Sequence, residues 1–265
     1  MKTIPQALAE LEQNSQSAAL CTVVKTSGST PRHSTSKMLV FPDGSIIGTV
    51  GGGELENQVV LEAKLAISNN QSKLIEYNMT DPTRGDVGIC GGQVMVFVEP
   101  INPSPLIVVI GAGHVGKAVA HLAKWLGYRV AISDDRPEFC TPETNPGADY
   151  FYPTEMKSLP DQLNITNQTY LILTTRGAST DIEGLPSLLK TSAGYIGIIG
   201  SKRRWVETVK QLSLNGITRQ ELSRVHSPIG LELNAETPEE IAVSILAEIL
   251  MIQKNGTGKR MKEKL

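Results

Sequence analysis

The chain of 265 residues contains 40% hydrophobic and 20% charged residues, and its 25 Lys and Arg side chains nearly balance 27 Asp and Glu side chains. This composition excludes a chain that is disordered throughout, and the length favours two modest domains or one large domain. The last twelve residues carry five basic side chains and one acidic side chain, which leaves a net charge of −6 on the rest. A body of that sign repels a phosphate backbone, so we expect no nucleic-acid partner.

The number and spacing of the cysteines, and the length of the apolar runs, indicate the cellular compartment. Cys21, Cys90 and Cys140 are odd in number and far apart, unlike a secreted disulfide framework. The first residues lack the apolar core of a signal peptide, and no window approaches the roughly 18 apolar residues that cross a bilayer. We therefore expect a cytoplasmic protein without a membrane partner.

The first hundred residues predict an α+β domain, here bounded as 1–100. Helical spacing of apolar residues predicts one helix over 5–11 and another over 55–67. Apolar and β-branched runs predict strands, which are expected at 18–24, 37–41, 45–50, 74–79 and 93–99. The turn residues Pro42-Asp43-Gly44 join two of these strands in a hairpin.

Three prolines lie among the six residues from Pro100 to Pro105. Proline fixes φ and removes a backbone donor, so this segment predicts a semi-rigid connector rather than a helix or a central strand. We place the domain boundary there.

After the connector, strands alternate with helices. The run Leu106–Ile110 is typical of a parallel strand buried on both faces. A helix over 115–126 and a last helix over 238–253 are predicted, and further strands are expected at 128–133, 169–174 and 194–199. Thr218 with Glu221 and Thr237 with Glu240 have capping-box spacing. The pattern predicts an α/β protein whose Rossmann-like parallel-sheet domain covers 101–253, with a frayed basic tail over 254–265.

The most specific local motif is a glycine loop with the pattern GxGxxG, which follows a predicted strand and opens a helix. Its glycines permit a tight turn, close approach of a pyrophosphate and close helix packing, and the helix N-terminus receives the anion. An acidic residue after the second strand could bind ribose hydroxyls, and the arginine beside it could face a phosphate. The candidate residues are Gly111, Gly113, His114, Val115, Gly116, Asp134, Asp135 and Arg136. The alternative is a scaffold whose nucleotide site is unused.

Three loops of the first domain have the composition of ligand-binding loops. The first offers hydroxyls and a guanidinium, the second leads from a strand into a helix, and the third holds a thiol among glycines. The candidate residues are Ser29, Arg32, Gly51, Gly52, Gly53, Glu54, Cys90, Gly91 and Gly92. Cys90 suits a soft metal ligand or a sulfur-transfer thiol. Taken singly, the loops also fit a polar hairpin, a tight turn and a buried cysteine.

These motifs occur together, in order, along nearly the whole chain. The segments that carry the likeness are Gly28–Arg32, Gly51–Glu56, Cys90–Gly92, Gly111–Gly116, Asp134–Phe139, Tyr195–Lys202 and His226–Leu231. On these segments the chain resembles the XdhC/CoxI family, the accessory proteins that mature xanthine dehydrogenase and related molybdenum hydroxylases.

The resemblance implies a non-catalytic or only partly enzymatic role, that of a cofactor chaperone. Such a protein binds molybdenum cofactor of the molybdopterin type, assists its sulfuration by a cysteine desulfurase, and passes it to a xanthine dehydrogenase-type molybdenum hydroxylase. It implies that Cys90 and its flanking glycines lie near the metal or its sulfur, and that Arg32 and the turn Gly51–Gly53 lie near cofactor phosphate. A homodimer is expected from the habit of the family.

The chain departs from the family pattern at two positions. Ala178 stands where the family usually has a histidine, so any role of that histidine is in doubt here, and the flanking Arg176 and Asp181 are expected to pair with each other. Gly53 stands where some relatives have a cysteine, which argues against a two-thiol mechanism. Two alternatives stay open: an NAD(P)-dependent oxidoreductase that uses the loop from Gly111 to Gly116, and a protein-binding adaptor with an unused nucleotide fold.

Overall fold

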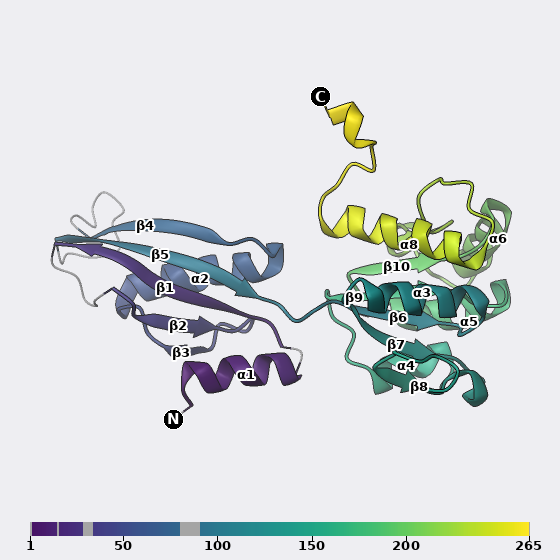
Figure 1. The fold of residues 1–265 in the computed structure, drawn as a ribbon, viewed down its shortest axis with the longest axis horizontal. Helices are drawn as coiled ribbons and strands as arrows, with labels where there is room; N and C mark the ends of the chain where they lie inside the picture. Colours follow the sequence, from purple (N-terminus) through teal and green to yellow (C-terminus); the bar gives the residue numbers. More distant parts are fainter. Residues whose placement is uncertain (1, 15, 29–33, 80–90, 265) are drawn as a thin grey trace. The chain divides into compact units, whose positions relative to one another are not determined.

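The computed structural model describes residues 2–14, 16–28, 34–79 and 91–264. The chain divides into two compact units, Met1–Pro103 and Ser104–Leu265. Each unit has its own sheet (Figure 1) and its own hydrophobic core.

The first unit contains an antiparallel sheet whose described strands have the order β3-β2-β1-β5-β4. Their bounds are β1 Ala18–Ser27, β2 Lys37–Val40, β3 Ile46–Gly48, β4 Lys73–Met79 and β5 Gly92–Ile101. Two helices, α1 (Ile4–Asn14) and α2 (Gly53–Asn69), accompany the sheet. The predicted helices and strands of this half are therefore present, with ends that differ by a few residues.

Alternation along β1 divides the core of this unit between two faces. Cys21 and Val23 pack with Leu55 and Val59 of α2, whereas Ala18 packs with residues of α1 in a second cluster. Successive side chains of a strand point to opposite faces, which explains how one strand serves both helices. The buried thiol of Cys21 is 0% exposed, as expected of a core cysteine.

Pro100 lies inside β5, where we expected a connector. Strand β5 continues to Ile101, and Pro100 stands opposite Ala19 of β1. The sheet tolerates the proline because β4 reaches only to Lys73, opposite Val98, so beyond that point β5 is an edge strand. The prediction that Pro100 belongs to the connector was therefore wrong, because it lies in the part of β5 that pairs with β1 alone.

The second unit contains a parallel sheet of six described strands in the order β11-β10-β9-β6-β7-β8. Their bounds are β6 Leu106–Ile110, β7 Arg129–Ser133, β8 Tyr150–Tyr152, β9 Thr169–Leu173, β10 Tyr195–Ile198 and β11 Val225–His226. The helices are α3 His114–Trp125, α4 Leu159–Gln162, α5 Ala178–Leu189, α6 Lys202–Leu214, α7 Arg219–Leu222 and α8 Pro238–Gln253. Short 3-10 turns cover Pro137–Phe139, Met156–Ser158 and Met261–Lys264. This arrangement confirms the predicted fold class, an α+β unit followed by a Rossmann-like parallel-sheet unit.

Helices cover both faces of this sheet. Ile107 and Val109 of β6 pack with residues of α3 and α8, which lie beside each other over one face in Figure 1. The alternate residues Val108 and Ile110 pack with α4, α5 and α6 on the other face. All five residues of β6 are buried, as expected for a strand at the centre of a doubly covered sheet.

Both predicted capping boxes are present. Thr218 and Thr237 accept from the backbone N–H of Glu221 and Glu240, and each glutamate accepts in return from the N–H of its threonine. In the part of the chain that the structure describes, no helix is both long enough and apolar enough to span a membrane.

Candidate ligand-binding crevice

A crevice lies at the carboxyl ends of β6, β7 and β9, where the order of the strands reverses. From β6 the chain moves to β7 on one side, and it later returns to β9 on the other side. Ligands of open α/β sheets bind at this kind of switch point. The lining residues are Ile110, Gly111, Gly113, Ser133, Asp134, Asp135, Arg136, Thr154, Glu155, Met156, Lys157, Thr174, Thr175, Arg176, Thr180, Glu183 and Gly184.

Two glycines of the loop are required by close backbone contacts. Gly111 has φ +105°, and a Cβ there would lie 2.6 Å from the carbonyl oxygen of Thr174. A Cβ on Gly116 would lie 2.1 Å from the carbonyl oxygen of Gly111. The loop therefore closes tightly against both its own helix and the end of β9.

The N-terminus of α3 is open toward a ligand. Gly113 is the N-cap residue, no side chain caps the helix, and a Cβ on Gly113 would meet nothing within 4 Å. The first amides of a helix carry partial positive charge and bind anions.

Two predicted residues lie at the start of α3. His114 lines a separate groove between α3 and α8, and Val115 packs against the core. Only their backbone amides remain candidates for an anion.

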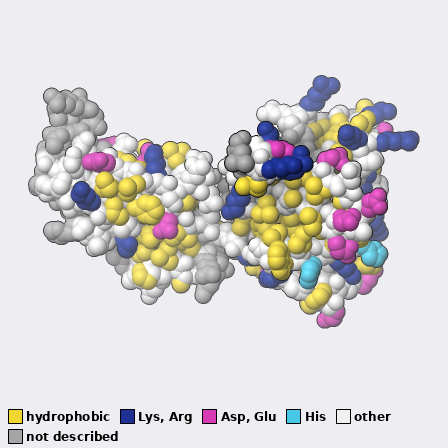
Figure 2. Space-filling view, turned by 45° about the horizontal axis from the view of Figure 1, so that its top comes forward, with side chains coloured by type: hydrophobic (Ala, Val, Ile, Leu, Met, Phe, Trp, Pro, Cys, Tyr) yellow, Lys and Arg dark blue, Asp and Glu magenta, His cyan; other side chains and the backbone are white. Residues whose placement is uncertain are grey.

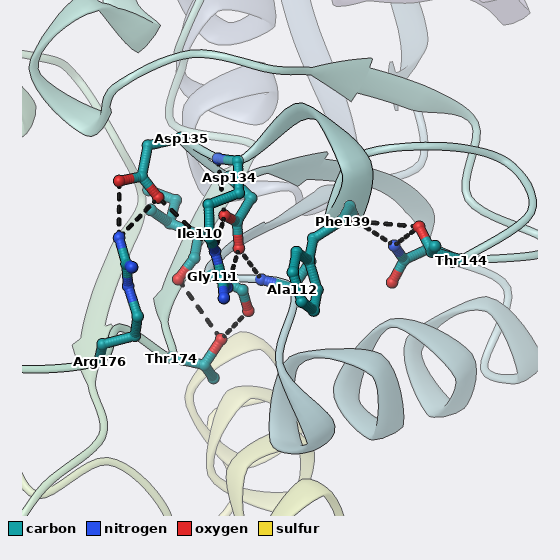
Figure 3. Close-up of polar contacts among 11 residues, drawn as sticks. Ile110, Gly111, Ala112, Asp134, Asp135, Phe139, Thr144, Thr174 and Arg176 are labelled. Atoms are coloured by element: carbon teal, nitrogen blue, oxygen red, sulfur yellow. Dashed lines mark hydrogen bonds and ion pairs between the residues drawn. The ribbon is translucent and has the colours of Figure 1, made fainter.

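Thr174, which follows β9, is hydrogen-bonded to the end of β6 and to the glycine loop. Its Oγ1 donates to the carbonyl oxygen of Gly111 at 2.5 Å, and its backbone N–H donates to the carbonyl oxygen of Ile110 at 2.8 Å. Figure 3 shows the threonine pointing at these two carbonyls. This contact holds the two sides of the switch point together.

Asp134, the predicted ribose acceptor, already accepts hydrogen bonds on both of its carboxylate oxygens. Its Oδ2 accepts from the N–H of Ala112 at 2.8 Å (Figure 3) and from Nη2 of Arg136 at 3.0 Å. Its Oδ1 accepts from the N–H and the Nε of Arg136 at 3.0 and 2.9 Å. Burial raises the pKa of Asp134, but the hydrogen bonds from Arg136 and Ala112 outweigh burial and hold that pKa below its usual range. The Arg136 guanidinium also lies 3.9 Å above the ring of Phe139.

The other charges at the crevice are also paired. Arg176 donates from Nη2 to both oxygens of Asp135 at 3.0 and 2.7 Å, as Figure 3 shows. Lys157 pairs with Glu155 and Glu183, at 2.8 Å each. Carboxylates and cations therefore lie side by side at the edge of the crevice.

The expected pair between Arg176 and Asp181 does not form. Asp181 is buried, 1% exposed, and accepts from Nη2 of Arg204 and from Oγ1 of Thr175, both at 2.5 Å. Burial raises the pKa of Asp181 against the lowering effect of these bonds. The prediction was wrong because Arg176 faces the end of β7, where Asp135 lies, whereas Asp181 faces α6. Ala178 begins α5 between them.

The described residues that flank the first and third predicted loops lie together at one end of the sheet of the first unit. Ser27, at the end of β1, pairs with Gln93, and a Cβ on Gly28 would lie 2.8 Å from the carbonyl oxygen of Gly91. The segment that leads to Gly51 leaves β3 beside Lys37, the first residue of β2, which stands opposite Thr22 of β1. Ser29, Arg32 and Cys90 lie outside the described residues, so their predicted roles stay predictions.

The glycine turn before α2 also holds an internal carboxylate. Oε2 of Glu56 accepts from the N–H groups of Val50 and Gly52, both at 3.3 Å, and from Oγ1 of Thr49 at 2.5 Å. Gly52 and Gly53 have φ of +78° and +61°, and a Cβ on either would meet nothing within 4 Å. Two predicted anion-binding loops therefore each bind a carboxylate of the chain itself. The predicted cofactor contacts of Gly51, Gly52, Gly53, Glu54, Gly91 and Gly92 stay predictions.

Sequence reasoning missed the residues that close the crevice opposite the glycine loop. Thr154, Met156 and Lys157 belong to the segment between β8 and α4, and Glu183 belongs to α5. No motif marks them, because only the folded sheet brings them to this edge. Ser133 had a signal, since it is the last residue of a predicted strand at the switch point.

Other motif residues form a structural cluster away from the crevice. Tyr195 donates to Oε1 of Glu248 at 2.7 Å, and its ring stacks on that of His226 with centroids 4.6 Å apart. Nδ1 of His226 lies 3.3 Å from the same carboxylate, and the N–H of Gly230 donates to Oε2 at 2.7 Å. These contacts tie the last strands to α8.

On the face that Figure 2 shows, basic and acidic side chains are interspersed, and hydrophobic side chains gather on part of the second unit. Trp125 on α3 and Val243 on α8 are exposed by 77% and 48%. Among the described residues, no group of three or more His, Cys, Asp or Glu side chains is placed to hold a metal ion.

These features define a Rossmann-type domain with a crevice at its switch point, together with an α+β domain built on an antiparallel sheet. Residues 107–249 match the XdhC Rossmann domain, and residues 11–78 match the XdhC and CoxI family. The chain belongs to the XdhC and CoxI family, as the resemblance of its motifs indicated.

Individual relatives agree with this assignment. The chain is 35% identical to YqeB of Escherichia coli (strain K12) over 252 residues, covering 94% of this chain and 46% of that protein. It is 32% identical over 159 residues to a probable xanthine dehydrogenase subunit of Bacillus subtilis (strain 168), covering 60% of this chain and 46% of that protein. It is 22% identical over 281 aligned residues to the molybdenum cofactor insertion chaperone PaoD of Escherichia coli (strain K12), covering 95% and 88%.

The chain spans about half the length of the first two relatives. A solved structure from Bacillus halodurans, described as a xanthine dehydrogenase, matches 99% of both chains with a TM-score of 0.52 and 20% identity. At 20% identity this similarity is evidence for the fold alone, and the two chains share that fold.

Proposed function

We propose that this protein is an accessory factor that binds molybdenum cofactor, assists its sulfuration, and inserts it into a xanthine dehydrogenase-type molybdenum hydroxylase. The observation that carries the proposal is the similarity to the insertion chaperone PaoD, which covers both units and 88% of that protein. A cysteine desulfurase as sulfur donor, a homodimer and a cytoplasmic location belong to the same proposal.

The chemistry of the crevice supports a cargo of this kind. A molybdopterin carries a phosphate and a flat heterocycle with N–H donors. The open N-terminus of α3 suits the phosphate, and the carboxylates of Glu155 and Glu183 suit N–H donors. Ile110 and Met156 add apolar surface for a ring. Within the first unit, Cys90 is the predicted thiol for the metal or its sulfur.

The oxidoreductase alternative receives less support from the same geometry. A nicotinamide cofactor in a Rossmann site is held by an acidic residue that accepts from its ribose. Here the Asp134 carboxylate already accepts hydrogen bonds from Arg136 and Ala112. An adaptor without a ligand remains a distinct outcome of the test below.

The direct test is to purify the protein from cells that make molybdopterin and to measure bound molybdenum and pterin. We expect both to co-purify in similar molar amounts. A preparation from cells that cannot make molybdopterin is the control. Absence of both, with tight NAD(P) binding instead, would support the oxidoreductase. Absence of every ligand, with a hydroxylase partner retained, would support the adaptor.

The thiol is tested by Cys90→Ala. We expect this change to reduce cofactor retention or its sulfuration by a cysteine desulfurase, measured on the purified protein. Cys140→Ala is the matched control, because Cys140 is a buried thiol in the second unit that donates to the carbonyl oxygen of Ile132. Equal behaviour of the two variants would remove Cys90 from the mechanism.

A further inference from the structure

The carboxylate of Asp134 has no acceptor capacity left. A carboxylate offers about four lone-pair positions. Its two oxygens receive four hydrogen bonds, one from Ala112 and three from Arg136, and its side chain is only 2% exposed. A ribose diol at the usual ribose position of the fold would find no free oxygen on Asp134.

The crevice nevertheless contains two groups that are placed to bind a ligand, the hydroxyl of Ser133 and the N-terminus of α3. Ser133 is 0% exposed and lines the crevice, and its Oγ has no hydrogen-bond partner among the described residues. A buried polar atom without a partner costs free energy unless a ligand or a water satisfies it. The neighbouring N-terminus of α3 has no side-chain cap and open space at Gly113. These groups suit phosphate oxygens, not a diol that needs an anionic acceptor.

We propose that Arg136 is a specificity-determining residue of this crevice. By holding both oxygens of Asp134 it removes the acceptor that a ribose diol requires, so the crevice takes its ligand through phosphate groups at Ser133 and the α3 N-terminus. The inference deepens the proposed function by naming how its site selects phosphate-bearing ligands. Its test uses no molybdenum cofactor, so either statement can fail without the other.

The test is the affinity of the full chain for NAD⁺, which carries both a pyrophosphate and ribose diols. Arg136→Met removes the guanidinium donors but keeps an apolar chain over Phe139. We expect the variant to bind NAD⁺ about tenfold to a hundredfold more tightly than the unmodified protein, the effect of hydrogen bonds to a charged acceptor. Isothermal titration calorimetry gives both dissociation constants.

Three comparisons make the result specific. Arg176→Met removes an equal charge from the crevice and frees Asp135, but leaves occupied the acidic residue at the ribose position of the fold, Asp134, so we expect no comparable gain. Asp134→Asn combined with Arg136→Met removes the freed acceptor, and the gain should vanish. Inorganic pyrophosphate should compete with NAD⁺ in the Arg136→Met variant, because both use the α3 N-terminus.

Arg136→Lys provides a second variant, since lysine keeps the charge but cannot hold two oxygens in a fork. We expect a smaller gain from it, with near-ultraviolet circular dichroism confirming the fold of each variant. Tight NAD⁺ binding by the unmodified protein would overturn the inference. So would folded Arg136 variants without a gain, an equal gain in Arg176→Met, or binding that pyrophosphate does not displace.

Discussion

At the scale of single residues, the glycine loop offers a matched pair of substitutions. Gly116→Ala places a Cβ 2.1 Å from the carbonyl oxygen of Gly111, whereas Gly113→Ala places one in open space. We expect Gly116→Ala to lower the free energy of unfolding by about 3 kcal/mol, the cost of overpacking. Gly113→Ala should cost less than about 1 kcal/mol. Urea unfolding measures both, and equal losses would mean that the loop relaxes around the new methyl group.

A second residue-scale prediction concerns Glu248. Burial raises the pKa of Glu248, but hydrogen bonds from His226, Tyr195 and Gly230 outweigh burial and bring it below the usual value of 4.5. A carboxyl group with a lowered folded pKa stabilises the protein above its unfolded pKa, and that stability is lost as pH falls through the folded pKa.

Unfolding free energies measured between about pH 3 and pH 6 should therefore fall toward acid, and Glu248→Gln should flatten part of that fall. Tyr195→Phe is the companion variant, since it removes one donor and keeps the carboxylate. It should cost about 1–2 kcal/mol at neutral pH. An unchanged pH profile in Glu248→Gln would contradict this account of the cluster.

At the scale of elements, α8 depends on its N-terminal cap. Oγ1 of Thr237 accepts from the N–H of Glu240 at 3.2 Å, and Pro238 occupies the first turn. Thr237→Ala should lower the free energy of unfolding by about 1 kcal/mol, whereas Thr237→Ser should restore most of it. Thermal unfolding followed by circular dichroism gives the difference, and equal losses for the two variants would show that the hydroxyl contributes nothing.

At the scale of the whole molecule, the two units have separate cores. The clusters on the two faces of the parallel sheet lie between Leu106 and Ile249, within the second unit. We expect a fragment of residues 104–265 to fold alone and to unfold cooperatively in urea. Dispersed amide resonances would confirm this. A fragment that gains secondary structure but no near-ultraviolet signal would show that the first unit is needed for its packing.

Much of the fold could be predicted because its signals are local. The run Leu106–Ile110, the glycines that follow it and the capping boxes each depend on neighbours within a few residues. The site could be predicted only in outline. Asp134, Arg136 and Arg176 were recognised as polar residues at strand ends, but their partners were not, since Asp135 and Arg176 are 41 positions apart.

The sequence by itself determined the class of this protein: an α+β unit, a Rossmann-like unit, and motifs of the XdhC and CoxI family. Apolar periodicity and glycine spacing are local properties of the chain, so the sequence alone carries them. Only the tertiary structure decided which charges pair. Strand order and register set Asp135 against Arg176 and Asp181 against Arg204, and the turn after β7 brings Arg136 back onto Asp134. The first two pairs join residues far apart in the sequence, and the third depends on the conformation of the turn after β7, so the sequence pattern specified none of them.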